Sequence, residues 1–438
     1  MTPALTLRVA VIATAMAMAT AVYATARTGE TAPAGLFASV DDLHRAAESN
    51  GPDRAALMAR AEAALDADPA PFIATDMSAL RFGWSEPATP PDDTLREAVD
   101  RLHRESDRMR DLALAFALAG DARHARAAER MMLLWAKQHT PVNFYDFEPD
   151  FVRARHLGAT EGFHSDRPWN FGLDAMWQAY GLVNASDALL LLRHGGHDLS
   201  APTERKIRDW LLRLVDAVNA SFHAWTRWAD ANASGAAAFH APSAGEEPSE
   251  LSAGFVRHRS DNHLSWALVG LLAGAVALED PKLADYALTG GIWTDRRAGA
   301  YANPSALPDV IDWAIEGAPD VRGRLFEERI GRARPLPYAL FHLEAMTLAA
   351  RIAALHFDVD LWRVEGRDGG GLLDAFRRYG EMLHGERPAP GDERDGRWLF
   401  ALSPEGYGGS RRTTLLEARP LPARMTHAIG PARLLFGR

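Results

Sequence analysis

Apolar residues recur at helical spacing along most of the chain. Between residues 94 and 119 and between residues 121 and 138 they fall three or four positions apart, as on one face of a helix, and Gly120 separates the two stretches. The same pattern returns from Trp169 to Leu192 and from Thr203 to Phe222. Two such stretches joined by a short break predict an antiparallel pair of helices.

The helical pattern also occurs on either side of these stretches. It runs from Val40 to Ala67, and it returns at Leu264–Leu278, Pro281–Gly290 and Pro337–Phe357. Alternation of the kind typical of strands is scarce before Trp398. Pairs of helices that recur at intervals of roughly 40 to 50 residues favour an all-α fold, an incomplete (α/α) toroid or barrel of helical hairpins.

The first 26 residues have the features of a secretory signal peptide. Arg8 precedes an apolar run from Val9 to Met18, and small residues from Ala24 to Ala26 suit cleavage by a signal peptidase. We therefore expect a periplasmic or secreted bacterial protein. An uncleaved anchor is the alternative, although the apolar run is short for a transmembrane span.

Proline, glycine and charge divide the rest of the chain. Residues 27–93 are predicted to hold a linker, a helix and a possible lid loop, and residues 94–388 the toroidal domain. The stretch from Trp225 to Arg259 is rich in Gly, Ser and Pro and is predicted to be a long loop. Residues 389–438 are predicted to form an irregular basic tail, either a flap over an acidic substrate or an exposed end.

Composition narrows the classes of function. The chain has 438 residues, 47% of them hydrophobic, which is enough for a large core. It has no cysteine, so disulfides, thiolate ligands and a cysteine nucleophile are excluded. The net charge is −10 and no run of Lys and Arg occurs, which argues against nucleic acid as a partner. No metal-ligand spacing or phosphate-binding loop stands out, so we expect neither a metal nor another cofactor.

Two polar residues open the most apolar of the predicted helices. Asn262 and His263 fall in its first turn if Ser260 or Asp261 is the N-cap, and free backbone N–H groups there favour an anion. Trp266 follows three or four positions later, on the same side of the helix. The three side chains could seat a carboxylated sugar ring. The alternative is a helix cap beside a core or solvated histidine.

A second helix start carries a tyrosine. Pro335 and Pro337 favour a helix that begins there, which places Tyr338 in its first turn. Arg332 and Arg334 lie just upstream. Because the inner helices of a toroid run parallel, both polar helix starts are expected on the same rim.

These two motifs resemble those of the periplasmic alginate lyases of polysaccharide lyase family five and the wider group that shares their domain. The family has an Asn-His pair with a Trp three residues beyond the His, matched here by Asn262, His263 and Trp266. It also has a basic segment that leads into a helix opening with Tyr, matched by Arg332 to Tyr338. The resemblance extends from Thr94 to Phe357.

The resemblance implies a lyase that breaks the 4-linked glycosidic bond of a uronic acid by β-elimination. Hydrogen bonds from Asn262, His263 and an arginine would neutralise the substrate carboxylate, in the manner of an oxyanion hole. Tyr338 would remove the C5 proton and then donate a proton to the leaving O4. For a substrate of the opposite C5 configuration, His263 is the alternative base.

The sequence departs from the family at positions that would contact substrate. The family arginine seven residues before the Tyr is Gly331 here, and Arg332 or Arg334 is the expected replacement. After Tyr338 the family has His-Asn-Tyr, where this chain has Ala339-Leu340-Phe341. These differences argue for a changed substrate more than for a changed reaction. The candidate substrate-binding residues are Trp266, Arg81 in place of the family's lid lysine, His342 (which could instead pack in the core), Trp169 and Asn170.

Two other functions remain open. A glycoside hydrolase needs two carboxylates flanking the scissile bond, and Asp261 and Glu344 are the acidic residues near the predicted site. A polysaccharide-binding or export protein without catalysis is the other alternative. In each case the expected partner is an acidic polysaccharide, and the protein is expected to be a monomer that is not inserted in a membrane after signal cleavage.

Overall fold

The computed structural model describes residues 32–72, 94–141, 166–233, 262–295, 299–303, 306–329 and 335–385, together with Leu399, Leu402 and residues 432–436. The helices in these ranges are α2 (Val40–Glu48), α3 (Pro52–Leu65), α4 (Thr94–Ala119), α5 (Ala122–Gln138), α7 (Asp166–His194), α8 (Ala201–Ala233), α10 (Asn262–Leu278), α11 (Pro281–Thr289), α12 (Leu307–Ala314), α13 (Phe326–Arg329), α14 (Pro335–Ile352), α15 (Leu372–Gly385) and α17 (Ala432–Phe436). A π-helical turn at Ala353–Phe357 continues α14, and a short 3₁₀ turn covers Leu361–Arg363.

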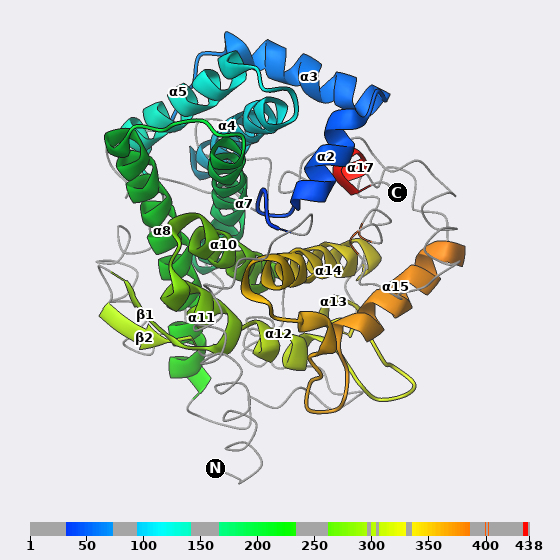
Figure 1. Ribbon diagram of the computed structural model, residues 1–438. Helices are drawn as coiled ribbons and strands as arrows, with labels where there is room; N and C mark the ends of the chain where they lie inside the picture. The colour runs from blue at the N-terminus through cyan, green and yellow to red at the C-terminus, as the bar shows by residue number, and fades with distance from the viewer. Residues whose placement is uncertain are drawn as a thin grey trace.

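Helical hairpins make up the architecture. Figure 1 shows the helices following one another around a curve, from α3 and α5 in blue and cyan, through α8 and α10 in green, to α14 and α15 in yellow and orange. Among the described residues the strands are β1 (Ile292–Asp295) and β2 (Gly299–Ala302), which pair as one antiparallel hairpin. The all-α prediction is confirmed, although the sequence analysis did not anticipate this small hairpin.

Helices α4, α7, α10 and α14 pack side by side in this order, and the first three of them run parallel. Arg110 of α4 donates a hydrogen bond to Asn184 of α7, and six residues later Phe116 of α4 approaches Gly195, just after the end of α7. Trp266 of α10 packs on Tyr180 of α7, while Gly274 approaches Leu182. Because partner numbers rise together along each pair, these three helices point the same way. Their N-termini therefore face the same side, as predicted for the inner helices of a toroid.

Helix α10 is enclosed on all sides, which explains why its sequence is apolar all round. It packs against α7, α8, α11 and α14. Gly270 allows the closest approach, because a Cβ atom at this position would lie 2.6 Å from Cβ of Ala179 on α7. On another face, a Cβ at Gly274 would lie 2.5 Å from Val215 of α8. The small residues thus let three helices meet closely beneath the polar start of α10.

Two predicted helices have different bounds in the structure. The stretch from Val40 to Ala67 divides into α2 and α3 at Gly51-Pro52, because proline lacks an N–H and disfavours a helical residue before it. Helix α8 continues to Ala233, so the prediction of a loop beginning at Trp225 is wrong for residues 225–233. This segment contains neither Gly nor Pro, the residues that most often end a helix. Residues 234–261 lie outside the described ranges.

The end of the predicted basic tail is docked in the structure. Leu434, Leu435 and Phe436 of α17 are buried, and α17 packs against α2 and α3. Arg351, near the end of α14, lies over the Phe436 ring with its guanidinium carbon 5.8 Å from the centroid. The same guanidinium donates to the Phe37 carbonyl oxygen at 2.9 Å and pairs with Asp42 at 2.8 Å. Residues 432–436 are therefore not an exposed tail.

One described segment, Leu336–Phe357, is long and apolar enough to cross a membrane by length and composition alone. It comprises α14 and the π-helical turn, and 78% of its most apolar window is buried inside the protein. Burial of this kind is the property of a core helix.

A buried histidine on the outer side of the helical array gives the fold a predicted sensitivity to acid. The ring of His139 accepts a hydrogen bond at Nδ1 from Trp210 Nε1–H (3.0 Å) and packs on Trp135. Burial, with a smaller effect from the Arg213 guanidinium, lowers the pKa of His139 from 6.5 to about 3. Below pH 6.5 the unfolded chain binds a proton that the folded chain rejects, so this contribution to stability is present above pH 6.5 and is lost as the pH falls toward 3.

We expect His139→Gln to flatten the dependence of stability on pH. The Gln amide oxygen can accept from Trp210 but does not titrate, so the wild type should lose about 2 kcal/mol more than the variant between pH 7 and pH 5. Urea unfolding at both pH values measures this difference. Asp187, whose pKa burial raises to about 6, contributes the opposite slope in both proteins and cancels in the comparison. Equal losses in the two proteins would contradict the assignment.

Candidate functional site

The start of α10 places two candidate residues in different surroundings. Asn262 is its first residue and is 2% exposed, whereas His263 is half-buried. The amide Nδ2 of Asn262 is buried and has no hydrogen-bond partner among the described residues. Leaving such a donor unsatisfied costs roughly 1–3 kcal/mol. A ligand that accepts a hydrogen bond would remove this cost.

Tyr338 lies in the first turn of α14, as predicted. It is the fourth residue of the helix, and its side chain is 39% exposed. Among the described residues, Tyr338 and Ile292 are the large hydrophobic side chains that are exposed. Helix α14 packs directly against α10, and α13, which ends shortly before α14 begins, approaches the first residue of α10. The structure therefore brings the two predicted helix starts to one side of the molecule.

A buried carboxylate, which the sequence analysis did not identify, joins these two helix starts. Glu327 of α13 is fully buried, and its Oε1 accepts a hydrogen bond from the backbone N–H of Asn262 (3.2 Å). The same carboxylate lies 3.0–3.1 Å from Nδ1 of His342 on α14. The other ring nitrogen of His342, Nε2, is 2.6 Å from Oγ of Ser265 on α10. Glu327, His342 and Ser265 thus form a buried series of hydrogen bonds that connects α13, α14 and α10.

His342 is consequently not available as a substrate contact. Its side chain is 0% exposed, and both ring nitrogens are engaged by Glu327 and Ser265. The second possibility in the sequence analysis, that His342 packs in the core, describes the structure. The order Ser265, His342, Glu327 has the bonding pattern of a nucleophilic triad. All three side chains are buried, however, so the Ser265 hydroxyl is not exposed to a substrate.

Trp266 also belongs to the core and does not form a sugar-stacking surface. Its side chain is 0% exposed and packs between Tyr180 of α7 and Phe341 of α14, with ring centroids 4.5 and 5.3 Å away. The Trp266 indole is held in place by these two neighbouring rings. The prediction that Trp266 contacts substrate is therefore corrected: it fixes α10 between α7 and α14.

The other predicted residues are less well placed by the structure. Arg81, Arg332 and Arg334 lie outside the described ranges. Trp169 and Asn170 lie in the first two turns of α7, where the backbone is described. Tyr180 packs on Trp266, and it lies fourteen residues after the start of α7, whereas Trp266 lies four residues after the start of α10. At 1.5 Å per helical residue, this difference means that α7 begins about 15 Å before α10 along their common direction. The α7 start thus extends past the α10 start on the side of the candidate site.

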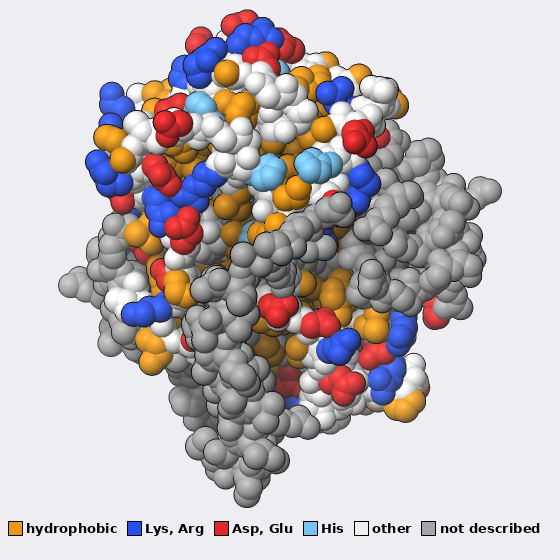
Figure 2. Space-filling model, in the orientation of Figure 1, with side chains coloured by type: hydrophobic (Ala, Val, Ile, Leu, Met, Phe, Trp, Pro, Cys, Tyr) orange, Lys and Arg blue, Asp and Glu red, His pale blue; other side chains and the backbone are white. Residues whose placement is uncertain are grey.

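Charges of both signs are mixed on one face of the described part of the protein. On the face shown in Figure 2, Lys and Arg side chains alternate with Asp and Glu side chains over the described part of the molecule. The net charge of −10 is therefore not gathered in one acidic patch on this part of the surface. An acidic polymer would meet local pairs of charges there, not a uniformly repulsive surface.

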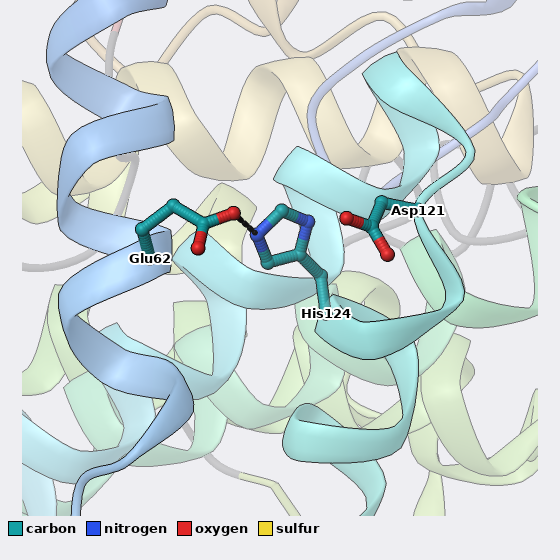
Figure 3. A group of neighbouring side chains, drawn as sticks. All are labelled: Glu62, Asp121 and His124. Carbon is teal, nitrogen blue, oxygen red and sulfur yellow. Dashed lines mark ion pairs between the residues drawn. The ribbon is translucent and has the colours of Figure 1, made fainter.

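One group of described side chains has the composition of a metal site. Ligand atoms of Glu62, Asp121 and His124 lie within 4.8 Å of one another (Figure 3). Arg123 already pairs with Asp121 at 2.7 Å and with Glu62 at 3.0 Å, and His124 Nε2 is 3.2 Å from Glu62. The hydrogen bond from Arg123 lowers the pKa of Asp121 to about 2. The guanidinium thus occupies carboxylate oxygens that a cation would need, and the group is an ion-pair network between α3 and α5.

The comparisons with known proteins identify the family. A model of the alginate lyase family matches residues 85–239 and 252–388, more than half of the chain. The chain belongs to the alginate lyase family. Its membership of the alginate lyase family makes it a polysaccharide lyase. No curated protein sequence matches the chain.

Solved alginate lyases share the fold. An alginate lyase from Bacteroides ovatus superposes with a TM-score of 0.59 at 16% identity, covering 92% of this chain and 98% of that one. A variant of alginate lyase A1-III complexed with a tetrasaccharide gives a TM-score of 0.54 at 14% identity, covering 95% and 98%. A second variant of that enzyme, also complexed with a tetrasaccharide, gives 0.52 at 13% identity. At these identities the likeness concerns the fold.

Proposed function

We propose that the chain is an exported lyase that cleaves a 4-linked uronic-acid polysaccharide by β-elimination. The observation that carries this proposal is the position of Asn262, His263 and Tyr338 in the first turns of two helices that pack against each other. In the proposed site, Asn262 and His263 bind the uronate carboxylate, and Tyr338 removes the C5 proton and donates a proton to O4. Arg332 or Arg334 supplies the cation that the family has at the position of Gly331.

The proposed roles follow from the charge that develops in the reaction. Removing the C5 proton places negative charge on the neighbouring carboxylate, which must be stabilised by hydrogen-bond donors. The Nδ2–H of Asn262 is such a donor: it is buried but, unlike the ring nitrogens of His342, it has no partner among the described residues, so the proposal requires the substrate carboxylate to enter beside the α10 start. Other N–H groups in the first turn of α10 add to it. Tyr338 is exposed to a substrate. As the phenolate, its oxygen takes the C5 proton, and the hydroxyl formed in this way then donates that proton to the leaving O4.

An acidic polysaccharide is the proposed substrate and partner. The tetrasaccharide bound by alginate lyase A1-III supports a saccharide chain as the ligand class. Trp266 and His342 are buried in this chain, so sugar contacts must come from other side chains, and we propose Trp169 and Asn170 for this role. We therefore propose a uronic-acid polymer, with alginate as one member of the class.

Export and a monomeric state are part of the proposal. The basic residue and apolar run in residues 1–26 support a cleaved signal peptide and a periplasmic or secreted location. Sequencing the N-terminus of the mature protein from the cell envelope and medium tests this. A mature chain that begins near residue 27 is the expected result.

The test of the activity is absorbance of the 4,5-unsaturated uronate product. The purified protein is incubated with polymannuronate, polyguluronate, glucuronan, hyaluronan and a gellan-type polymer. A rise with at least one polymer that is lost in His263→Ala is expected. New reducing ends without absorbance would identify a glycoside hydrolase, and binding without cleavage would identify a polysaccharide-binding protein; either would overturn the proposal. Glu344, a carboxylate that a hydrolase would need, is buried.

A further inference from the structure

We infer that Glu327 is a positioning residue for the lyase reaction, an inference that rests on the proposed function. Its carboxylate fixes the start of α10, which carries Asn262 and His263, relative to α14, which carries Tyr338. Glu327 does not touch the substrate in this role, because it is fully buried. It acts through the backbone of Asn262 and through the ring of His342.

The contacts form a closed link between the two helices. Glu327 holds the first N–H of α10 at 3.2 Å and His342 Nδ1 at 3.0 Å. His342 in turn reaches Ser265 at 2.6 Å, three residues after Asn262 and one turn deeper in α10. The α10 start is therefore held at two points one turn apart. A helix held at two points cannot shift along its axis or rotate without breaking a hydrogen bond.

The link reaches Tyr338 through helix geometry. Tyr338 and His342 are four residues apart in α14, so they lie on the same face one turn apart. Asn262 and Ser265 are three apart in α10 and are related in the same way. His342 is therefore one turn from Tyr338 in α14, and Ser265 is one turn from Asn262 in α10. The Ser265–His342 hydrogen bond joins these two turns, and Glu327 contacts both Asn262 and His342.

The hydrogen-bond directions within the link are set by the carboxylate. An ionised carboxylate only accepts, so Nδ1 of His342 carries a hydrogen. Nε2, the other ring nitrogen, hydrogen bonds to the Ser265 hydroxyl. The two bonds together fix the orientation of the imidazole ring, in the way that outer partners orient functional histidines.

Fold stability alone does not account for this carboxylate. Burying a charge costs free energy that its hydrogen bonds recover only in part, and apolar groups of the same size often stabilise a core as well or better. What the carboxylate adds is a directed connection among α10, α13 and α14. A displacement of about 1 Å at reacting groups can reduce a rate about a hundredfold, so such a connection matters most at a catalytic centre.

The neighbouring Glu328 provides a matched control. Its carboxylate pairs with Arg378 at 2.6 Å and accepts from the Tyr379 hydroxyl at 2.9 Å, both on α15. Glu327 and Glu328 are therefore adjacent glutamates that tie α13 to different helices. Only the contacts of Glu327 reach α10 and α14.

The experiment compares Glu327→Met, Glu327→Gln and Glu328→Met with the wild type on the polymer that the wild type cleaves. Met keeps the length of Glu but has no oxygen acceptor, whereas Gln can still accept from Asn262 and hydrogen bond to His342. For each protein, kcat per folded molecule, KM and the melting temperature are measured. We expect Glu327→Met to lower kcat at least about tenfold with KM changed less than about threefold, and Glu327→Gln to retain most of the rate. Glu328→Met should lower the melting temperature and leave kcat unchanged.

A second measurement does not depend on activity. Hydrogen exchange of the peptide at the α10 start, residues 262–268, should be faster in Glu327→Met and unchanged in Glu327→Gln and Glu328→Met. Unchanged exchange, or an unchanged kcat in Glu327→Met, would overturn the positioning role. If the wild type cleaves no polymer, the proposed function fails, and the exchange result still decides whether Glu327 anchors the α10 start.

Discussion

Replacing Tyr338 by Phe should lower kcat by about 10² to 10⁴-fold while the protein still binds its polymer. The substitution removes one hydroxyl from a side chain that is 39% exposed, so little packing is lost. In the proposed mechanism the phenolate oxygen receives the C5 proton and the resulting hydroxyl returns it to O4, so no other group in the first turn of α14 can replace it. Initial rates from the absorbance of the unsaturated product, with binding measured by calorimetry, test this expectation.

The matched control is the same substitution at a structural tyrosine. The Tyr379 hydroxyl accepts from the Leu325 backbone N–H at 3.0 Å and donates to Glu328, inside the α13–α15 contact. Tyr379→Phe should lower the melting temperature and leave kcat per folded molecule near that of the wild type. A Tyr338→Phe variant that keeps a rate within about threefold of the wild type would exclude Tyr338 as the proton carrier.

Replacing Trp266 by Ala should destabilise the fold by about 3–5 kcal/mol. The indole is fully buried between Tyr180 and Phe341, so its removal leaves a cavity where α7, α10 and α14 meet. These helices are continuous and closely packed, which limits how far they can collapse into the space. Chemical denaturation followed by circular dichroism measures the loss.

Trp266→Phe separates a packing role from sugar binding. Nε1 of Trp266 is buried without a hydrogen-bond partner among the described residues, so Phe removes an unsatisfied donor together with part of the ring. The loss should therefore be clearly smaller than that of the Ala variant. If Trp266 instead stacked on a sugar, Trp266→Ala would weaken polymer binding with little change in the free energy of unfolding.

The sequence predicted the helices well because their information is local. Helices α4 and α5 begin and end within one residue of the predicted bounds, since apolar spacing and Gly120 mark them directly. The start of α14 at Pro335 was also predicted, from the preference of proline for the first turn. The predicted bounds were wrong where the prediction relied on composition alone. The loop predicted from Trp225 to Arg259 is an example, because its sequence is rich in small polar residues only from Ser234 on.

The environment of the candidate site was harder to predict because it depends on distant contacts. Glu327-Glu328-Arg329 reads as a charged surface turn, and burial of Glu327 follows from its contact with Asn262, 65 residues earlier. One local signal was available for Trp266. A helix that is apolar on every side, as α10 is, has no solvent-facing stripe, so an aromatic residue in its second turn is expected in the core.

The contacts of the Arg351 side chain connect parts of the protein that are far apart in sequence. Its hydrogen bonds to Phe37 and Asp42 span 314 and 309 residues, and its ring contact with Phe436 reaches α17. Bringing together segments so widely separated costs chain entropy that local helix formation does not, and contacts of this kind form slowly. The end of α14 should therefore be among the last regions to order during refolding, after the hairpins around it have formed.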